Sequence, residues 1–84
     1  MAPQLTAEEL RDILVSYGGI APERVTTERA TRLDLLGLDS VGLLSVMLEI
    51  EARYSARLFD EDAPSFTTLG SALDLINARL ANPG

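Results

Sequence analysis

The 84-residue sequence contains no cysteine, no histidine and no lysine. Without cysteine the chain can form no disulfide, thiolate nucleophile or thiolate metal site, and without histidine it lacks the most common metal ligand and general base. Because lysine is missing as well, the usual side chains that activate a nucleophile near pH 7 are absent. We therefore expect no catalytic residue and no metal site, and we predict that the chain is not an enzyme by itself.

Long hydrophobic runs are also absent. The longest apolar stretch, VGLLSVMLEI, is interrupted by Ser45 and Glu49, and it falls far short of the roughly 18 residues that a membrane span needs. The beginning of the chain, MAPQLTAEEL, has no basic segment followed by an apolar one, as a secretion signal would have. We therefore expect a cytoplasmic protein that does not bind a membrane.

Basic residues are few. Seven arginines stand against 13 acidic residues and give a net charge of −6. Binding to a nucleic-acid backbone requires a basic face, so the composition argues against nucleic acid as a partner. An acidic domain instead suits a basic surface on another protein, by electrostatic complementarity.

The length and the apolar content predict one small domain. The chain is about half the usual size of a single domain, and its 46% of apolar residues is too high for a disordered chain. We expect a single domain over residues 1–84 that folds alone, with an ordered core over about residues 5–81 and short flexible ends.

The first predicted helix begins at Thr6. Thr6 and Glu9 fit the pattern of a capping box, and Leu5 and Leu10 stand where a hydrophobic staple would place them. Helical spacing then predicts one buried face, formed by Leu10, Ile13, Leu14 and Tyr17, and Gly18 and Gly19 end the helix.

Residues 20–38 show no sustained period of either type and predict a long ordered loop with a short helical turn. A loop of this length is uncommon in a compact domain and is usually functional. Its apolar residues are expected to pack on the core; they are Ile20, Val25, Leu33, Leu36 and Leu38.

A second helix is predicted over about residues 40–55, with Asp39 as its N-cap. Its core stripe consists of Leu43, Val46, Met47, Ile50 and Tyr54. Asp60 can cap a short turn over residues 61–63. Thr67 or Thr68 can cap a last helix, whose core positions are Leu69, Ala72, Leu73, Ile76 and Leu80. The sequence therefore predicts an all-α fold of three main helices and one short helix.

The start of the second helix carries the one feature that suggests chemistry. Val41, Leu44 and Leu48 point away from the core stripe and should be exposed. Ser40 is the first residue of that helix, where unpaired backbone N–H groups and the helix dipole favour an anionic group. The pattern predicts a phosphate-type adduct on Ser40.

Two alternatives to this prediction stay open on pattern alone. Asp39 and Ser40 could be only an N-cap and its neighbour, as most such pairs are. The apolar residues Val41, Leu44 and Leu48 could pack under the loop over residues 20–38.

The residues around Ser40 resemble a known family. The run Leu36-Gly37-Leu38-Asp39-Ser40-Val41 is similar to the phosphopantetheine attachment motif of acyl carrier proteins. The resemblance extends over nearly the whole chain in the expected order. It includes the capped first helix, the long loop, the aromatic Tyr54, the acidic segment DED at residues 60–62 and FTTLGSALDLIN at residues 66–77.

The resemblance implies a four-helix bundle that carries acyl intermediates as thioesters. It implies that Ser40 accepts 4′-phosphopantetheine from coenzyme A, in a reaction catalysed by a separate phosphopantetheinyl transferase that uses Mg²⁺. Ser40 would then be a modification site that catalyses nothing. The implied partners are this transferase, an acyl-loading enzyme and a ketosynthase or similar synthase component. We expect the carrier to be a monomer.

The resemblance also assigns partner recognition to the second helix. Val41, Leu44 and Leu48 match apolar recognition positions, and Asp39 and Glu51 match acidic ones that attract basic residues of partner enzymes.

At two positions the chain departs from the fatty-acid carriers. Acidic residues that are common there are replaced by Gly42 and Ser45, which leaves a more apolar docking face. We therefore predict a carrier of a polyketide or other specialised pathway. A fatty-acid carrier, an aminoacyl or peptidyl carrier, and an unmodified helical interaction module are the alternatives.

Overall fold

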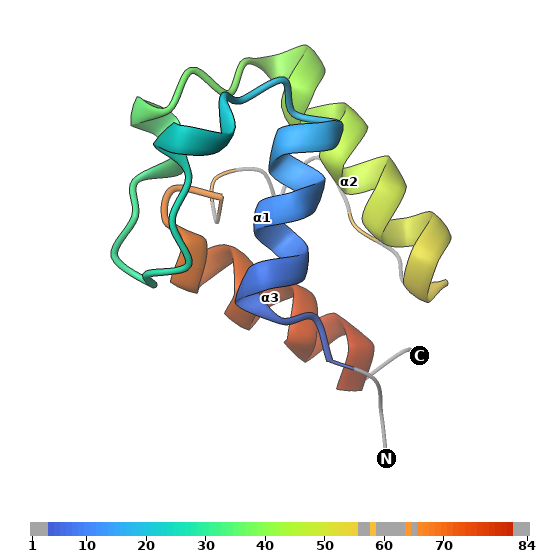
Figure 1. Cartoon of the computed structure of the whole chain (residues 1–84). Helices are drawn as coiled ribbons and strands as arrows, with labels where there is room; N and C mark the ends of the chain where they lie inside the picture. Colours follow the sequence, from blue (N-terminus) through green and yellow to red (C-terminus); the bar gives the residue numbers. More distant parts are fainter. Residues whose placement is uncertain (1–3, 56–57, 59–63, 65, 82–84) are drawn as a thin grey trace.

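The computed structural model describes residues 4–55, 58, 64 and 66–81. Its α-helices are α1 (Ala7–Ser16), α2 (Ser40–Tyr54) and α3 (Leu69–Ala81), as Figure 1 shows. Two single-turn 3-10 helices, η1 (Pro22–Arg24) and η2 (Leu33–Leu35), lie between α1 and α2. Within the described ranges the only strand-like pairing is an isolated bridge between Arg32 and Thr68. The prediction of an all-α fold with three main helices is confirmed. The short turn predicted after Asp60 lies outside the described residues.

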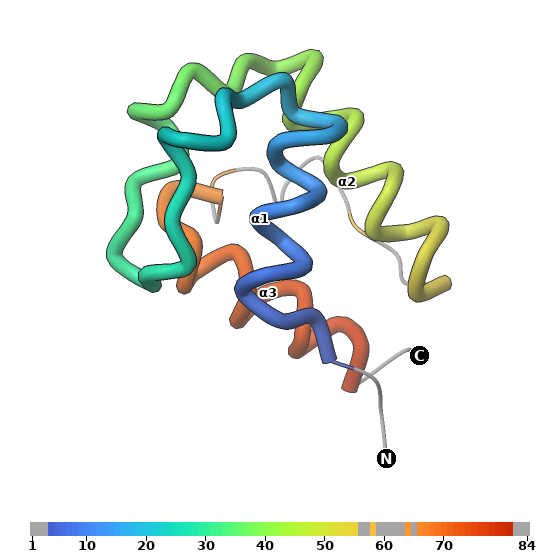
Figure 2. The backbone as a smooth tube through the Cα atoms, in the orientation of Figure 1, coloured from blue at the N-terminus to red at the C-terminus, as the bar shows by residue number. Residues whose placement is uncertain are grey.

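Helix α1 contacts both α2 and α3 (Figure 1). Figure 2 shows the chain leaving α1, descending to the start of α3, and then returning to begin α2 beside the end of α1. The loop over residues 20–38 therefore links the ends of all three helices. None of the described helices is long and apolar enough to cross a membrane.

The start of α1 is as predicted, but the role of Glu9 is different. Thr6 is the N-cap, and its hydroxyl accepts a hydrogen bond from the Glu9 amide at 3.1 Å. The Glu9 carboxylate does not complete the capping box. It accepts hydrogen bonds from the Tyr54 hydroxyl and from Arg53. Glu9 therefore ties the first turn of α1 to the last turn of α2.

The end of α1 corrects one prediction about the core. Tyr17 is 43% exposed and lies just beyond the helix, so it does not belong to the buried face. The helix stops because Gly19 adopts a left-handed conformation, with φ of +71°, and the Ile20 amide turns back to the Leu14 carbonyl. This reversal directs the Tyr17 side chain outwards.

The long loop packs on the core as predicted. Ile20, Val25 and Leu33 are buried, and Leu36 and Leu38 are half-buried against the core. Backbone carbonyls of this loop are also held by α1, because the guanidinium of Arg11 donates to Val25 at 3.1 Å and to Pro22 at 3.0 Å.

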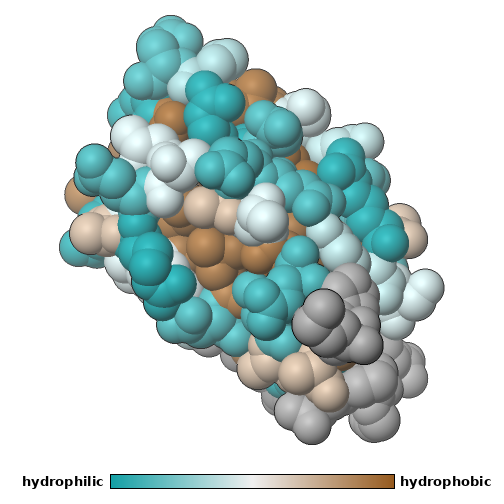
Figure 3. All heavy atoms as spheres, turned by 60° about the horizontal axis from the view of Figure 1, so that its bottom comes forward, coloured by the Kyte–Doolittle hydropathy of each residue, from teal (hydrophilic) through white to brown (hydrophobic). Residues whose placement is uncertain are grey.

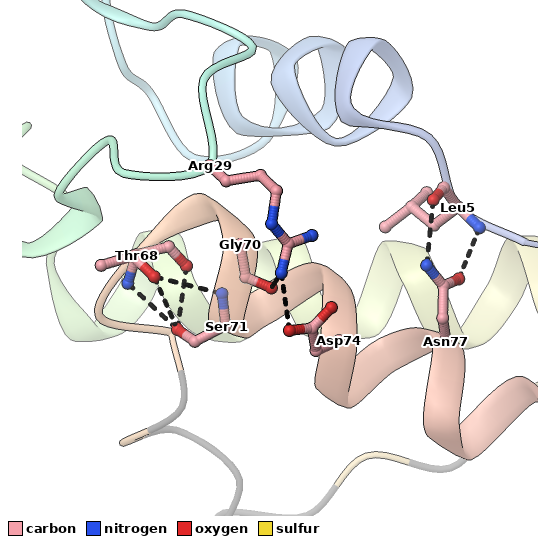
Figure 4. A network of polar contacts seen from close by, with 7 residues as sticks. All are labelled: Leu5, Arg29, Thr68, Gly70, Ser71, Asp74 and Asn77. Carbon is pink, nitrogen blue, oxygen red and sulfur yellow. Dashed lines mark hydrogen bonds and ion pairs between the residues drawn. The ribbon is translucent and has the colours of Figure 1, made fainter.

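The same loop caps the start of α3. The amides of Leu69 and Gly70 donate to the carbonyls of Thr31 and Arg29, both at 2.9 Å. The next amide, of Ser71, donates to the Thr68 hydroxyl at 3.1 Å, which makes Thr68 the capping side chain (Figure 4). Three amide groups that a helix start leaves unpaired are thus satisfied.

Two side chains of α3 connect it to other segments. Arg29 reaches from the loop to Asp74 at 2.7 Å, passing over Gly70 (Figure 4). Further along α3, the amide group of Asn77 forms hydrogen bonds with both the N–H and the C=O of Leu5 (Figure 4). The segment before α1 is therefore fixed to α3.

The core contains the residues that helical spacing predicted on α2 and α3. Val46, Met47 and Ile50 are buried and Leu43 and Tyr54 are half-buried against them. All the predicted core positions of α3 are buried, namely Leu69, Ala72, Leu73, Ile76 and Leu80. Figure 3 shows hydrophobic residues gathered in the middle of one face, with hydrophilic residues around them.

The contact between Tyr54 and Glu9 predicts how stability depends on pH. Burial and the hydrogen bond to Glu9 raise the pKa of Tyr54 from 10.0 to about 12. Because folding favours the protonated phenol, the stabilisation from Tyr54 is complete below pH 10 and is lost as the pH rises towards 12. The urea midpoint of unfolding should fall over this range. The Tyr54→Phe variant should show a smaller fall, and an equal fall in both proteins would contradict this contact.

Candidate functional site

Ser40 is the first residue of α2 and is exposed. The N-cap is Asp39, whose Oδ1 accepts a hydrogen bond from the Gly42 amide at 2.6 Å. The Asp39 carbonyl accepts the next bond, from the Leu43 amide at 2.8 Å. Because the cap is formed by its neighbour, the Ser40 hydroxyl makes no hydrogen bond with any residue that the structure describes. The prediction that Asp39 caps and Ser40 is exposed is confirmed.

The backbone next to Ser40 offers hydrogen-bond donors. The Gly42 amide is used by Asp39, whereas the amides of Ser40 and Val41 have no partner in the described part of the chain. No acidic residue lies within the first turn of α2 itself. Free amides at the positive end of a helix suit a phosphate oxygen, by about 0.3–1 kcal/mol at an exposed site. The chemistry at Ser40 therefore fits a phosphodiester-linked group.

The chain reaches Asp39 through a tight turn after η2. Gly37 has a φ of +89°, a conformation that a residue with a side chain rarely adopts. Leu38 then turns inwards, where its Cδ1 atom lies against Gly18 and Gly42. The turn and this contact together set the direction from which the chain enters α2.

An apolar stripe follows Ser40 on the outer side of α2. The α2 stripe consists of Val41, Leu44 and Leu48, which are 71%, 53% and 55% exposed. These residues do not pack under the loop, so that alternative is wrong. Contiguous exposed apolar residues of this kind are typical of surfaces that bind other proteins.

The two acidic residues expected to recognise partners have partners within the chain. Asp39 caps α2, as described above. Glu51 is half-buried, and its Oε2 accepts a hydrogen bond from the Leu58 amide at 2.8 Å. The remaining acid of α2, Glu49, is bonded to Arg53. The α2 stripe is therefore bordered by carboxylates that already serve the fold.

Sequence reasoning missed the surroundings of two further residues. Leu35, in η2, is 66% exposed, although it lies among residues that pack inwards. Gly42 is buried, so it is not part of a docking face. Glycine in the first turn of a helix lowers the stability of the helix. Its presence there was the one sign in the sequence that a close contact requires a residue without a side chain.

Among the residues that the structure describes, none forms a hydrogen bond with the Ser40 hydroxyl. In the ranges that the structure describes, no cluster of acidic, histidine or cysteine residues could hold a metal ion. The nearest carboxylate along the chain, on Asp39, is directed to the Gly42 amide.

Comparison with known proteins agrees with this site. The family model of the phosphopantetheine attachment site matches residues 8–76, which include Ser40 and all of α2. The chain belongs to this family of carrier proteins. The family carries covalently attached 4′-phosphopantetheine, so the cofactor implied by the sequence resemblance is confirmed at the level of the family.

Solved structures of an acyl carrier protein are similar over their full length. They are forms of the carrier from the actinorhodin polyketide synthase of Streptomyces coelicolor, one with a 3-oxo-butyl group and one with a 3,5-dioxohexyl group. Both are 31% identical to this chain, and each comparison covers 100% of both chains. The TM-scores are 0.79 and 0.84. The resemblance to acyl carrier proteins and the fold that it implies are thus confirmed.

The division of roles between Asp39 and Ser40 can be measured as stability. Ser40→Ala should change the free energy of unfolding by less than about 0.5 kcal/mol, because the hydroxyl makes no bond within the described chain. Asp39→Ala should lower it by about 1 kcal/mol, because the helix loses its cap. Urea unfolding of both variants measures the difference. A larger loss for Ser40→Ala would contradict the assignment of the cap.

Proposed function

We propose that this protein is the acyl carrier of a polyketide synthase, with its 4′-phosphopantetheine attached to Ser40. The observation that carries the proposal is the exposed Ser40 hydroxyl, left free because Asp39 caps α2. Its position within the family match supports the assignment. The pathway is supported by the similarity over the full chain to the carrier of the actinorhodin polyketide synthase.

The proposed group would supply a thiol that holds the acyl chain as a thioester. The residues of this chain bind and orient the attached group. The free amides of Ser40 and Val41 bind phosphate oxygens, and Asp39 holds the helix start that orients them. No side chain of the described site removes the Ser40 proton. We therefore assign the attachment and all later acyl chemistry to partner enzymes and none to this chain.

We further propose that partner enzymes dock on the α2 stripe. The partners are the phosphopantetheinyl transferase, an acyl-loading enzyme and a ketosynthase. An enzyme that reaches the Ser40 hydroxyl must lie against Val41 and Leu44, which follow it within the first turns of the exposed helix face. These contacts are apolar, and apolar anchors at the centre of an interface contribute most of its binding energy.

Asp39 and Glu51 contribute to recognition through the fold in this proposal. Each carboxylate accepts a backbone hydrogen bond, one at the start of α2 and one near its end. They hold the helix that presents the α2 stripe. We place the protein in the cytoplasm with its synthase, as a monomeric carrier domain over residues 1–84.

The attachment site can be tested by intact mass. The purified protein should gain one phosphopantetheinyl group on incubation with coenzyme A, Mg²⁺ and a promiscuous phosphopantetheinyl transferase. Ser40→Ala should gain none while remaining helical by circular dichroism. No gain in the folded wild type, also with the transferase of its native host, would contradict the carrier function and favour an unmodified interaction module.

The docking surface can be tested with the same reaction. Leu44→Ser and Leu48→Ser should each raise the KM of the transferase for the carrier about tenfold, because each removes an apolar anchor. Thermal stability should change little, since both side chains are exposed.

Leu35→Ser is the matched control for this experiment. It makes the same substitution at a leucine that is even more exposed but lies outside α2. We expect the KM of the transferase for the Leu35→Ser carrier to stay within about twofold of its value for the wild-type carrier. An equal effect of Leu35→Ser and Leu44→Ser would contradict docking through the α2 stripe.

A further inference from the structure

The chain carries two glycines, Gly18 and Gly42, in close backbone contact at the start of α2. Gly42 is the third residue of α2 and is buried. A Cβ atom at this position would lie 2.8 Å from the Gly18 carbonyl oxygen, closer than real Cβ atoms come to a backbone atom. The first turn of α2 therefore lies directly on the backbone that ends α1, and Figure 2 shows the two segments side by side.

Two side-chain atoms also lie close to position 42. The Cβ atom would also lie 3.1 Å from Asp39 Oδ1 and 3.2 Å from Leu38 Cδ1. Asp39 forms the cap, and Leu38 contacts Gly18 as well, where a Cβ atom would lie 3.1 Å from its Cδ1. Any side chain at position 42 would therefore displace the residues that come just before Ser40.

Glycine at this position has a measurable cost. In a helix it is less favourable than alanine by about 1 kcal/mol. We take the close approach of the Gly18 carbonyl as the reason that glycine stands here in place of alanine. The contact between Gly42 and Gly18 keeps Leu38 and Asp39 in place. These two residues determine where α2 starts and hence the position of Ser40.

We infer that Gly42, through its contact with Gly18, is a positioning residue for the modification of Ser40. The inference rests on the proposed attachment of phosphopantetheine to Ser40. A side chain at position 42 would force the first turn of α2 away from the Gly18 carbonyl and would shift the Asp39 carboxylate by a few tenths of an ångström, which weakens its capping bond. Ser40 would then leave the helical position from which its hydroxyl is presented beside Val41. The rest of the α2 stripe would stay intact.

The kinetics of the transferase separate this role from a loss of binding. Gly42→Ala should lower kcat about tenfold, because a misplaced nucleophile reacts slowly. The KM for the carrier should stay within about twofold, because Leu44 and Leu48 lie beyond the first turn. In the Gly42→Ala variant without phosphopantetheine, the amides at positions 42 and 43 should exchange hydrogen faster than in the wild type, since both amides bond to Asp39.

Gly70→Ala provides a matched control. Gly70 is also a buried glycine in the first turn of a helix, and a Cβ atom there would lie 3.0 Å from Arg29 Cβ. The substitution should lower the melting temperature of the protein as Gly42→Ala does. It should leave both kcat and KM of the transferase reaction unchanged. An equal loss of kcat in both variants would overturn the inference, because it would show an effect of general destabilisation.

A second pair of variants tests the same turn without adding atoms at position 42. Asp39→Ala should lower kcat as Gly42→Ala does, and Asp39→Asn should restore it, since asparagine also caps a helix. Unchanged kcat in Gly42→Ala, or failure of asparagine to restore it, would overturn the inference while leaving the carrier function in place. Absence of modification in the wild type would instead contradict the proposed function itself.

Discussion

The hydrogen bond from the Gly42 amide to the Asp39 carboxylate determines how α2 begins, and the proposed function depends on it. Because Asp39 is the cap, Ser40 is the first helical residue and its hydroxyl is exposed. Had Ser40 been the cap, its oxygen would accept a backbone N–H group and the helix would begin one residue later. A difference of one residue thus separates a hydroxyl that other proteins can reach from one that stabilises the fold.

The rest of the molecule keeps this helix start in place. The loop over residues 20–38 is held by Arg11 of α1 and by backbone bonds to the start of α3, which together fix its residues 22–33. Glu9 and Glu51 hold the far end of α2, through Tyr54 and Leu58. With its carboxylates used in this way, α2 presents an apolar surface to solvent although the chain as a whole is acidic.

Local features were predictable from the sequence because they depend on nearby residues. The caps at Thr6 and Asp39, the buried face of α3 and the exposure of the α2 stripe follow from spacing and side-chain type. Other features depend on segments far apart in the chain and left no local signal. The bond between Glu9 and Tyr54 and the bonds between Leu5 and Asn77 are of this kind. Gly42 is intermediate, since its cost in a helix hints at a contact but does not identify Gly18.

The most direct test of this account is to locate the attached group by tandem mass spectrometry. Trypsin cleaves after Arg32 and Arg53, and the peptide between these sites contains only two hydroxyl groups, on Ser40 and Ser45. Fragments that break the peptide between these serines show which of them carries phosphopantetheine. We predict that the whole added mass lies on Ser40. Added mass on Ser45, or on any other peptide, would contradict it.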